Sequence, residues 1–465
     1  MTEENERSGM GRRRFFRYAG GVAGAVIGAG AVSRWAGPTL RPFAADHALA
    51  ADITYPAPDM FLGGTDGWIG MPPTSAPIAP FFPDDLAPPP FNTYIFGFRN
   101  VTELTDVQRI GQKNHAQHNA PLFWVDEFDP ASPKDFRVDI TNLGLAQRPD
   151  LFDAHTLHWH GFRNVIPFFD GEPTGSVSVP AGSRFTYIYR PRDPGTYMYH
   201  CHVEDVEHVH MGMTGLVFVR PKQNGNTSYY PSGKYAYNDG DGSTGYDREF
   251  MMFLSEVWGE AHWADSHIQL PEWSDYHPDF SLLNGRSYPD TLAANTSYGA
   301  GTDLTTWTKP YMPAEVDGDG TLVPTAGSEH LQFQPLSSLI TCNAAERVLL
   351  RFANLGFKEP SMTMAGITMK VVGRDATPMT GRDHNSDTSY ETNTISVGAG
   401  ESYDVIFVAP AFTGGTGSSG LGYDTYLLYN RDYTRDDNHN GRGGQTTEVH
   451  VYAAGALPVQ TVPNT

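Results

Sequence analysis

The stretch YHCHVEDVEHVHMGMTG, residues 199–215, concentrates metal-binding side chains in one short segment. It contains four histidines, two methionines and Cys201, one of only two cysteines in the chain. A second histidine-rich segment, HTLHWHG, begins at His155. Thiolate, thioether and imidazole groups together suit copper, whereas a closed zinc site has little use for methionine. The two segments therefore predict copper chemistry.

Strand geometry divides these ligands into two groups. Successive side chains of a strand point to opposite faces of the sheet. If both segments are extended and adjacent, His155 shares a face with the sulfur of Cys201. The opposite face then presents the imidazoles of His158, His160, His200 and His202. We therefore expect two separate metal sites.

The loop after Cys201 can complete the first site. A thiolate, two imidazoles and a weak axial thioether form the trigonal copper site that serves electron transfer. His208 and Met213 are the preferred additional ligands, because their spacing lets a tight loop return to the same ion. His210 is the alternative to His208.

The second site would exchange electrons with the first. His200 and His202 are each joined to Cys201 by one peptide unit, which gives an electron a short covalent path. A reduction at the second site can also consume protons, and Glu204 is the preferred proton relay. Carboxylates near metal sites also serve as anchors for imidazole N–H groups, so that reading of Glu204 stays open.

The elements that must position these ligands occur twice in the chain. Three pairs of segments match in the same order: 135–145 with 346–357, 178–189 with 396–407, and, more weakly, 195–202 with 424–432. An internal repeat whose segments keep the same order predicts a duplicated β domain. Short strands separated by frequent turns favour an all-β chain with a Greek-key β-sandwich in each copy.

Composition and the repeat together set the expected domain boundaries. The expected segments are an export leader over 1–50, a Pro-rich irregular arm over 51–91, the first sandwich over 92–222, a linker over 223–245, the second sandwich over 246–455 and a tail over 456–465. Residues 259–313 would form a long insertion in the second sandwich. A chain of 465 residues is long enough for several domains.

The N-terminal residues and the overall charge indicate location and exclude one class of partner. The sequence GRRRFFR, residues 11–17, precedes a short glycine-rich apolar stretch and resembles a twin-arginine export signal. Export would place the protein in the periplasm or outside the cell, and an uncleaved membrane anchor is the alternative. The net charge of -21 argues against a nucleic-acid partner. Cys342 is expected to be a buried thiol.

The two histidine-rich segments resemble the paired copper signatures of the multicopper oxidases, the laccase-like cupredoxin family. The resemblance implies two cupredoxin-like domains, a small-molecule or metal-ion electron donor, and oxygen as the acceptor. The two-domain members with type 1 copper in the first domain further imply a homotrimer. The implied ligands are His155, Cys201, His208 and Met213 for type 1 copper, His158 for type 2 copper, and His160, His200 and His202 for type 3 copper.

The second copy departs from the family's pattern. A complete trinuclear centre would need further histidines there, and the loop from Cys201 to His208 is longer than is typical. The aligned positions are Thr363 and Ala365 in one segment, and Asn430 and Asp432 in the other, or Tyr429 and Arg431 if the register shifts by one. The second copy is therefore expected to keep the sandwich without the ligands.

This departure leaves three functions open. An oxidase that reduces oxygen is preferred, with the second site completed by a partner chain or by His115 and His118. A nitrite-reductase-like enzyme and a type 1 copper electron carrier are the alternatives. The copper content per chain separates them, because it falls from the oxidase to the reductase-like enzyme and again to the carrier.

Overall fold

The structure is a computed structural model that describes residues 56–296, 298, 302–381, 386–415, 420–439 and 441–465. Residues 58–465 form one compact unit, which carries every element described below. The expected leader over 1–50 lies outside the described residues. No helix within the described ranges is long and apolar enough to cross a membrane.

Two four-stranded sheets form the first sandwich. One has the order β2 (Thr93–Asn100), β1 (Met60–Ile69), β4 (Phe136–Gly144) and β6 (Arg184–Tyr189). The other has the order β3 (Phe123–Asp126), β8 (Thr214–Arg220), β7 (Gly195–His200) and β5 (His158–His160). Side chains from both sheets, among them Val138, Tyr187 and Tyr199, form a buried core that also contains Cys201.

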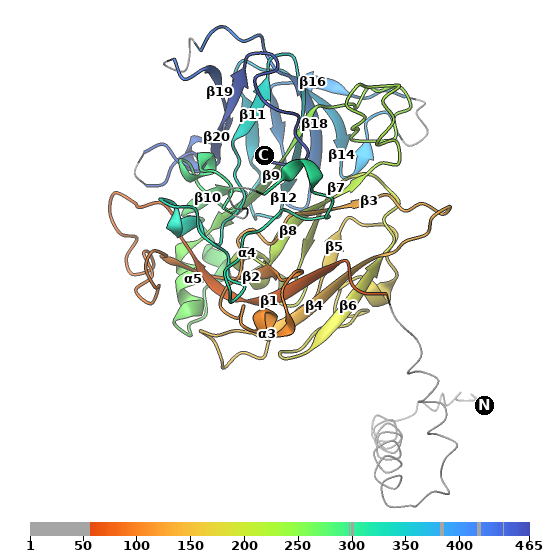
Figure 1. The fold of residues 1–465 in the computed structure, drawn as a ribbon. Helices are drawn as coiled ribbons and strands as arrows, with labels where there is room; N and C mark the ends of the chain where they lie inside the picture. The colour runs from red at the N-terminus through yellow and green to blue at the C-terminus, as the bar shows by residue number, and fades with distance from the viewer. Residues whose placement is uncertain (1–55, 297, 299–301, 382–385, 416–419, 440) are drawn as a thin grey trace, which may run out of the picture. The chain divides into compact units, whose positions relative to one another are not determined.

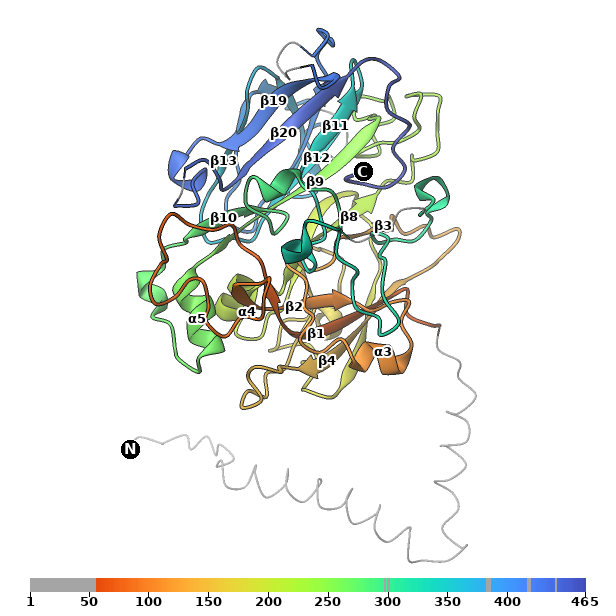
Figure 2. The ribbon, with the colours of Figure 1, turned by 60° about the vertical axis from the view of Figure 1, so that its left-hand side comes forward.

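A larger pair of sheets forms the second sandwich. The first of them runs β10 (Phe280–Leu283), β9 (Arg248–Val257), β12 (Arg347–Asn354), β18 (Ser402–Val408), β14 (Met369–Arg374) and β15 (Thr377–Pro378), with β16 (Tyr390–Thr392) paired to β14. The other runs β11 (Ile340–Asn343), β20 (Thr446–Tyr452), β19 (Tyr423–Asn430), β13 (Ser361–Met364) and β17 (Thr394–Ser396). Figures 1 and 2 show these strands in the upper half of the molecule and the first sandwich in the lower half.

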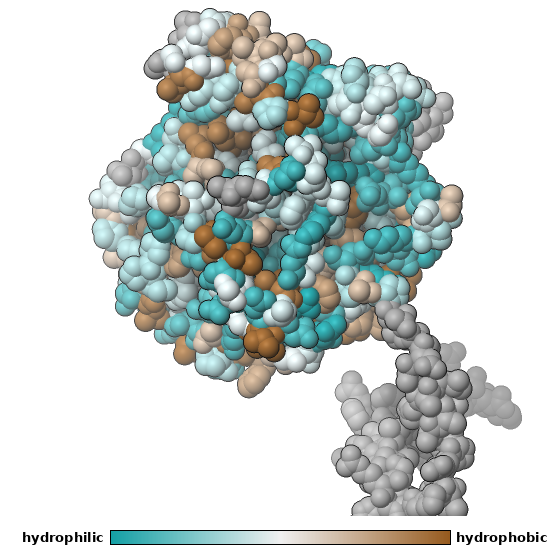
Figure 3. Space-filling view, in the orientation of Figure 1, coloured by the Kyte–Doolittle hydropathy of each residue, from teal (hydrophilic) through white to brown (hydrophobic). Residues whose placement is uncertain are grey.

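Helices in the described part of the chain are short and lie in the connections between strands. The α-helices are α3 (Asp106–Ile110), α4 (Asp205–Met211) and α5 (Gly259–Ser266). The 3₁₀ turns are η1 (Pro167–Phe169), η2 (Trp273–Asp275), η3 (Asp290–Leu292), η4 (Leu304–Thr306), η5 (Glu329–Leu331) and η6 (Tyr433–Arg435). The face in Figure 3 is mainly hydrophilic, with hydrophobic residues in small scattered groups.

Equivalent hydrogen bonds recur in the two sandwiches. Asn142, at the end of β4, donates from Nδ2 to the carbonyl of Val179 at 2.9 Å. Asn354, at the end of β12, donates from Nδ2 to the carbonyl of Val397 at 2.9 Å. The prediction of an all-β chain with two β-sandwiches is confirmed, and the shared asparagine shows that both were built on one pattern.

Strand β1 corrects the expectation of an irregular arm over 51–91. It lies between β2 and β4 in the middle of a sheet, and nine of its ten residues are buried. Its glycines are required by close packing, since a Cβ on Gly64 would lie 2.7 Å from the His155 ring and one on Gly67 would lie 2.8 Å from the backbone of Ala116. In the sequence, these glycines resembled the glycines of a loop. Their actual role is to let other parts of the chain pack closely against β1.

A buried ion-pair network joins the two sandwiches. Arg351 on β12 contacts Glu249 Oε2 at 3.1 Å and Asp404 Oδ1 at 3.3 Å. The first sandwich contributes Thr196 on β7, which donates to Asp404 Oδ1 at 2.5 Å, and Arg220 on β8, which contacts Glu249 Oε1 at 2.9 Å. The strand that carries His200 is thereby anchored to the second sandwich.

Candidate metal centres

The two histidine-rich segments are neighbours in one sheet. Strand β5 pairs with β7 in antiparallel register, so that His158 lies opposite His200 and His160 opposite Met198. Cys201 follows β7 directly, and β8, next to β7, begins at Thr214 after the ligand loop. Both segments are extended and adjacent at this point, as the strand argument requires.

A first cluster consists of His155, Cys201 and His208, whose ligand atoms all lie within 4.8 Å of one another. The Cys201 sulfur is 3.2 Å from Nδ1 of His208 and 4.0 Å from Nδ1 of His155. All three side chains are buried. Two imidazoles therefore present the same ring nitrogen to one sulfur, which is a donor set that suits copper.

Backbone hydrogen bonds hold the sulfur and the ligand loop in place. The Thr156 N–H donates to the sulfur at 3.5 Å, and the Cys201 N–H donates to the Met213 carbonyl at 3.0 Å. The long loop after Cys201 folds into α4, and the Met213 N–H donates to the His208 carbonyl at 2.8 Å. Met213 is fully buried in the same core cluster as Cys201, so it stays the predicted axial ligand.

The charges of the first cluster favour a thiolate. Burial alone would raise the pKa of the Cys201 thiol, but the charge of His208 and hydrogen bonds from both imidazoles hold that pKa well below its usual value. Burial alone would lower the pKa of His208, but Cys201 and Asp153 raise it to about 10. Nε2 of His208 lies 3.7 Å from Asp153 Oδ2. A cation is therefore favoured beside the sulfur, and a copper ion fits that requirement.

A second cluster gathers the remaining imidazoles. The ligand atoms of His158, His160 and His200 lie within 4.8 Å of one another. The His202 ring adjoins them, with its centroid 5.1 Å from that of His158 and 5.3 Å from that of His200. The strand argument therefore groups these four side chains as the structure does, with three of them converging and His202 beside them.

Two histidines of the second cluster, His158 and His200, have free Nε2 lone pairs. Nδ1 of His158 lies 2.7 Å from the Asp170 carbonyl, and Nδ1 of His200 lies 2.7 Å from the Cys201 carbonyl. A carbonyl can only accept, so each Nδ1 carries the proton and leaves Nε2 able to bind a metal. Burial lowers the pKa of His158 and His160, and lowers that of His200 to about 3, which keeps the rings neutral.

A glycine turn of the second sandwich leaves space at the second cluster. A Cβ on Gly400 would lie 2.9 Å from Nε2 of His160. Gly400 also has a φ of +80°, which side chains rarely adopt. A side chain at this position would press against Nε2 of His160, so the glycine keeps that nitrogen uncovered.

Glu204 is placed differently from its predicted role. It groups with Glu207 and His208, on the side of the first cluster, rather than with the imidazoles of the second. One carboxylate beside the second cluster is that of Asp170, whose Oδ1 lies 3.4 Å from Nδ1 of His158. The role of Glu204 as a relay to the second site therefore stays a prediction, with the residue placed at the start of helix α4. No motif in the sequence links Asp170 to the histidine-rich segments, so sequence reasoning did not identify it.

The other candidate histidines are engaged elsewhere. Nε2 of His210 accepts a hydrogen bond from the Trp258 N–H at 3.1 Å, so His208 rather than His210 faces Cys201. His115 stacks on Phe333, with 5.3 Å between ring centroids. His118 packs against Gly212, where an added Cβ would lie 2.5 Å from its Nδ1. These contacts do not bring His115 or His118 to the imidazoles of the second cluster, and their part in completing it stays a prediction.

The register of the second sandwich decides between the two alignments. Thr363 on β13 lies opposite Tyr429 on β19, as His158 lies opposite His200. Tyr429 and Arg431 are thus the counterparts of His200 and His202, and Asn430 is the counterpart of Cys201. Asn430 Oδ1 accepts from the Ser361 N–H at 3.1 Å, which repeats the Thr156 hydrogen bond to the sulfur. An amide has replaced the thiolate.

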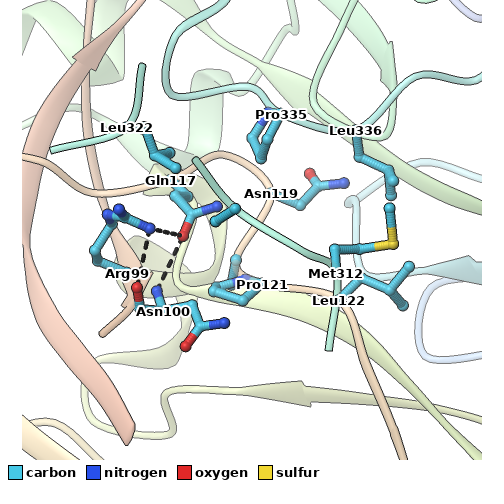
Figure 4. A pocket seen from close by; sticks show the side chains of 12 residues that line it. Arg99, Asn100, Gln117, Asn119, Pro121, Leu122, Met312, Leu322, Pro335 and Leu336 are labelled. Atoms are coloured by element: carbon cyan, nitrogen blue, oxygen red, sulfur yellow. Dashed lines mark hydrogen bonds between the residues drawn. The ribbon is translucent and has the colours of Figure 1, made fainter. Parts of the chain in front are cut away.

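The small cavity in Figure 4 is a separate feature. Its volume is about 40 Å³, and its lining includes Arg99, Gln117 and Asn119 but none of the sulfur or imidazole ligands. Arg99 Nη1 donates to Gln117 Oε1 at 3.1 Å and to the Asn100 carbonyl at 2.9 Å. Burial lowers the pKa of Arg99 to about 9. The metal chemistry of the chain therefore lies outside this cavity.

Comparison with known proteins gives matches to multicopper oxidases. Residues 141–224 match the family model described as multicopper oxidase. Laccase-like multicopper oxidase 1 of Thermothelomyces thermophilus is 42% identical over 52 residues, which are 10% of this chain and 8% of that protein. The match therefore spans a small part of that relative's length.

Two solved structures resemble the chain along most of its length. The multicopper oxidase mgLAC has a TM-score of 0.53 at 20% identity, with 86% of each chain covered. The blue copper oxidase from Nitrosomonas europaea has a TM-score of 0.51 at 19% identity, with 84% of this chain and 85% of that chain covered. Residues 141–224 are thus similar to the multicopper oxidase family, and the chain has the all-β, cupredoxin-like fold of these two oxidases.

Proposed function

We propose that the chain is a copper-dependent oxidoreductase that takes electrons from a small donor or a metal ion at the Cys201 site and passes them to oxygen at the histidine site. The observation that carries this proposal is the placement of His200 and His202 beside Cys201. The sulfur faces His155 and His208, while its two neighbours in sequence join the second cluster. Copper bound at both sites would supply one-electron redox chemistry.

The protein's own residues prepare both sites for this role. Burial of Cys201 and His208 excludes water from the first site, and the Thr156 N–H stabilises the negative sulfur. At the second site the Asp170 carbonyl holds the His158 ring in one tautomer. The Asp170 carboxylate, 3.4 Å from the same ring, is the group we propose as a local carrier of protons.

A one-copper electron carrier is the second candidate. It is favoured by the second sandwich, whose residues at the aligned positions are Thr363, Ala365, Tyr429 and Arg431. In the oxidase, a homotrimer or a partner chain would have to supply the missing ligands.

The nitrite-reductase-like alternative needs only the three converging histidines. We also propose export to the periplasm or beyond, from the twin-arginine-like sequence at residues 11–17.

One experiment separates these functions. The purified protein would be loaded with copper, its copper content per chain measured, and oxygen uptake followed with phenols, cuprous ions and manganous ions as donors. The proposal expects oxygen uptake together with copper at both sites. A filled Cys201 site without oxygen uptake would favour the carrier, and nitrite consumption in place of oxygen uptake would favour the reductase-like enzyme.

A further inference from the structure

The first copper site offers no ligand to the solvent. Cys201 and His208 are 0% exposed and His155 is 1% exposed. A donor at the surface therefore cannot touch the site, and its electrons must cross intervening protein. The inference below rests on the proposed function, because it concerns the route by which electrons reach this site.

Helix α4 connects the buried site to an aromatic cluster. His208 and His210 are two residues apart on α4, so they point to opposite sides of the helix. The His208 ring faces the sulfur, whereas the His210 ring contacts Tyr276, with 5.3 Å between ring centroids. The Trp258 N–H holds His210 by its Nε2 at 3.1 Å. His210 thus lies between the copper-ligand helix and Tyr276.

The aromatic cluster reaches the surface. Trp273 and Tyr276 are partly exposed, and Phe357, whose ring centroid lies 5.1 Å from that of Tyr276, is 36% exposed. Leu270, on the same segment as Trp273, is 92% exposed. A planar aromatic donor therefore finds an apolar aromatic surface at Tyr276.

Tyr276 has a partner that can take its proton. Its hydroxyl donates to Glu256 Oε2 at 2.9 Å, and Glu256 is buried. The other oxygen, Oε1, has no hydrogen-bond partner among the described residues, and the nearest cation is Arg435 Nη1 at 3.9 Å. Burial raises the pKa of Glu256, so its carboxylate binds a proton more tightly than an exposed carboxylate would. The Lys358 ammonium lies 5.2 Å from the Tyr276 ring centroid. It would disfavour a positively charged ring, so oxidation of Tyr276 requires loss of the proton.

We propose that Tyr276 is a redox-active relay that carries electrons from a phenolic donor at the surface, through His210, to the Cys201 site. Tyr276 gives one electron to the metal of that site, its O–H bond breaks, and the proton passes to Glu256. The donor then gives one electron to the oxidised Tyr276, and Glu256 returns the proton to the phenolic oxygen. The donor leaves as a radical after releasing its own proton to solvent, so electrons and protons balance.

Tyr94 is another tyrosine near the site, and it does not meet the same requirements. It approaches His208 through Phe96, with centroid distances of 5.6 Å and 5.8 Å, and its hydroxyl donates to Asp66 at 2.8 Å. Tyr94 is, however, 0% exposed, so no donor can reach it. Surface access and a proton acceptor coincide at Tyr276.

The test measures how fast the blue absorption of the copper-loaded protein bleaches in the absence of oxygen. Hydroquinone serves as the phenolic donor, and hexaammineruthenium(II) serves as a cationic reductant that the carboxylates near His208 attract. In Tyr276→Phe we expect bleaching by hydroquinone to slow at least about tenfold, with bleaching by the ruthenium complex unchanged. The rate with hydroquinone should also lose its solvent deuterium isotope effect. Glu256→Gln should weaken that isotope effect, because the proton acceptor is removed.

The control is Tyr433→Phe, since Tyr433 is 82% exposed on η6 and should leave both rates unchanged. Thermal unfolding would confirm that the variants are folded. Equal hydroquinone rates in the wild type and Tyr276→Phe would overturn the relay and point to entry at the carboxylates near His208. Absence of the blue absorption in the wild type would instead overturn the proposed function, and the relay with it.

Discussion

In the proposed function, electron transfer depends on Cys201. Cys201→Ser removes the thiolate, so we expect loss of the intense blue absorption and of all donor oxidation. The matched control is Cys342→Ser, because Cys342 is also buried but belongs to the core of the second sandwich. Burial raises the pKa of Cys342 to about 12, so its thiol stays neutral. Visible absorption and copper content report the outcome, and a blue Cys201→Ser protein would remove Cys201 from the site.

Asp436 gives the stability of the protein a dependence on pH. Burial raises the pKa of this carboxyl from 3.8 to about 7. The folded chain therefore holds this proton more tightly than the unfolded chain, and the contribution of Asp436 to the free energy of unfolding falls as pH rises from about 4 to about 7. Asp436→Asn should flatten the melting temperature across that window. Melting curves that retain the full wild-type slope would contradict this assignment.

The glycine turns are the elements in which the two sandwiches can be compared directly. Gly400 and its counterpart Gly182 have φ values of +80° and +76°, so alanine at either position should cost about 1 kcal/mol of stability. Only Gly400→Ala places a methyl group against His160, because a Cβ on Gly182 meets nothing within 4 Å.

We therefore expect Gly400→Ala to lower the metal content of the second site while the blue absorption persists. Gly182→Ala should keep both metals. Copper analysis and denaturant unfolding measure the two effects separately. Equal copper loss in both variants would mean that strain in the backbone, rather than contact with His160, is responsible.

At the same scale, the strands and α4 show how far the candidate site was predictable. The grouping of His155 with Cys201, and of His158 with His200, follows from strand parity and agrees with the measured distances. The role of Asp170 and the position of Glu204 did not follow, because both depend on how loops return to the strands. A loop has no periodic pattern in its sequence from which its path could be predicted.

At the scale of the whole molecule, the buried network of Arg351 ties the copper-ligand sheet to the second sandwich. Arg351→Met would leave Glu249 and Asp404 without this cation, and breaking a buried pair in this way costs about 3–5 kcal/mol. Arg374→Met is the control, because the pair of Arg374 with Glu401 is exposed and should contribute less than about 1 kcal/mol. Denaturant unfolding gives both values. Similar losses in the two variants would show that burial does not set the strength of the network.

The duplicated fold as a whole could be anticipated, but the place of β1 could not. The repeated segments around Asn142 and Asn354 are similar enough to reveal two sandwiches. Strand β1 lacks an alternating pattern, because its glycines make room for His155 and Ala116 far along the chain. Those contacts exist only once the sandwich has formed.

The sequence by itself determined that the Cys201 sulfur and the flanking imidazoles point to opposite faces, because covalent backbone geometry sets the direction of neighbouring side chains. Tertiary structure alone decided that His208 meets the sulfur while His210 turns toward Tyr276, since the rotation of α4 depends on what packs against it. It also decided that Asn430 replaces the sulfur in the second sandwich, because the pairing of β13 with β19 sets that register. The directions of neighbouring side chains follow from the backbone geometry of adjacent residues. Which distant segments come into contact depends on how the whole chain packs.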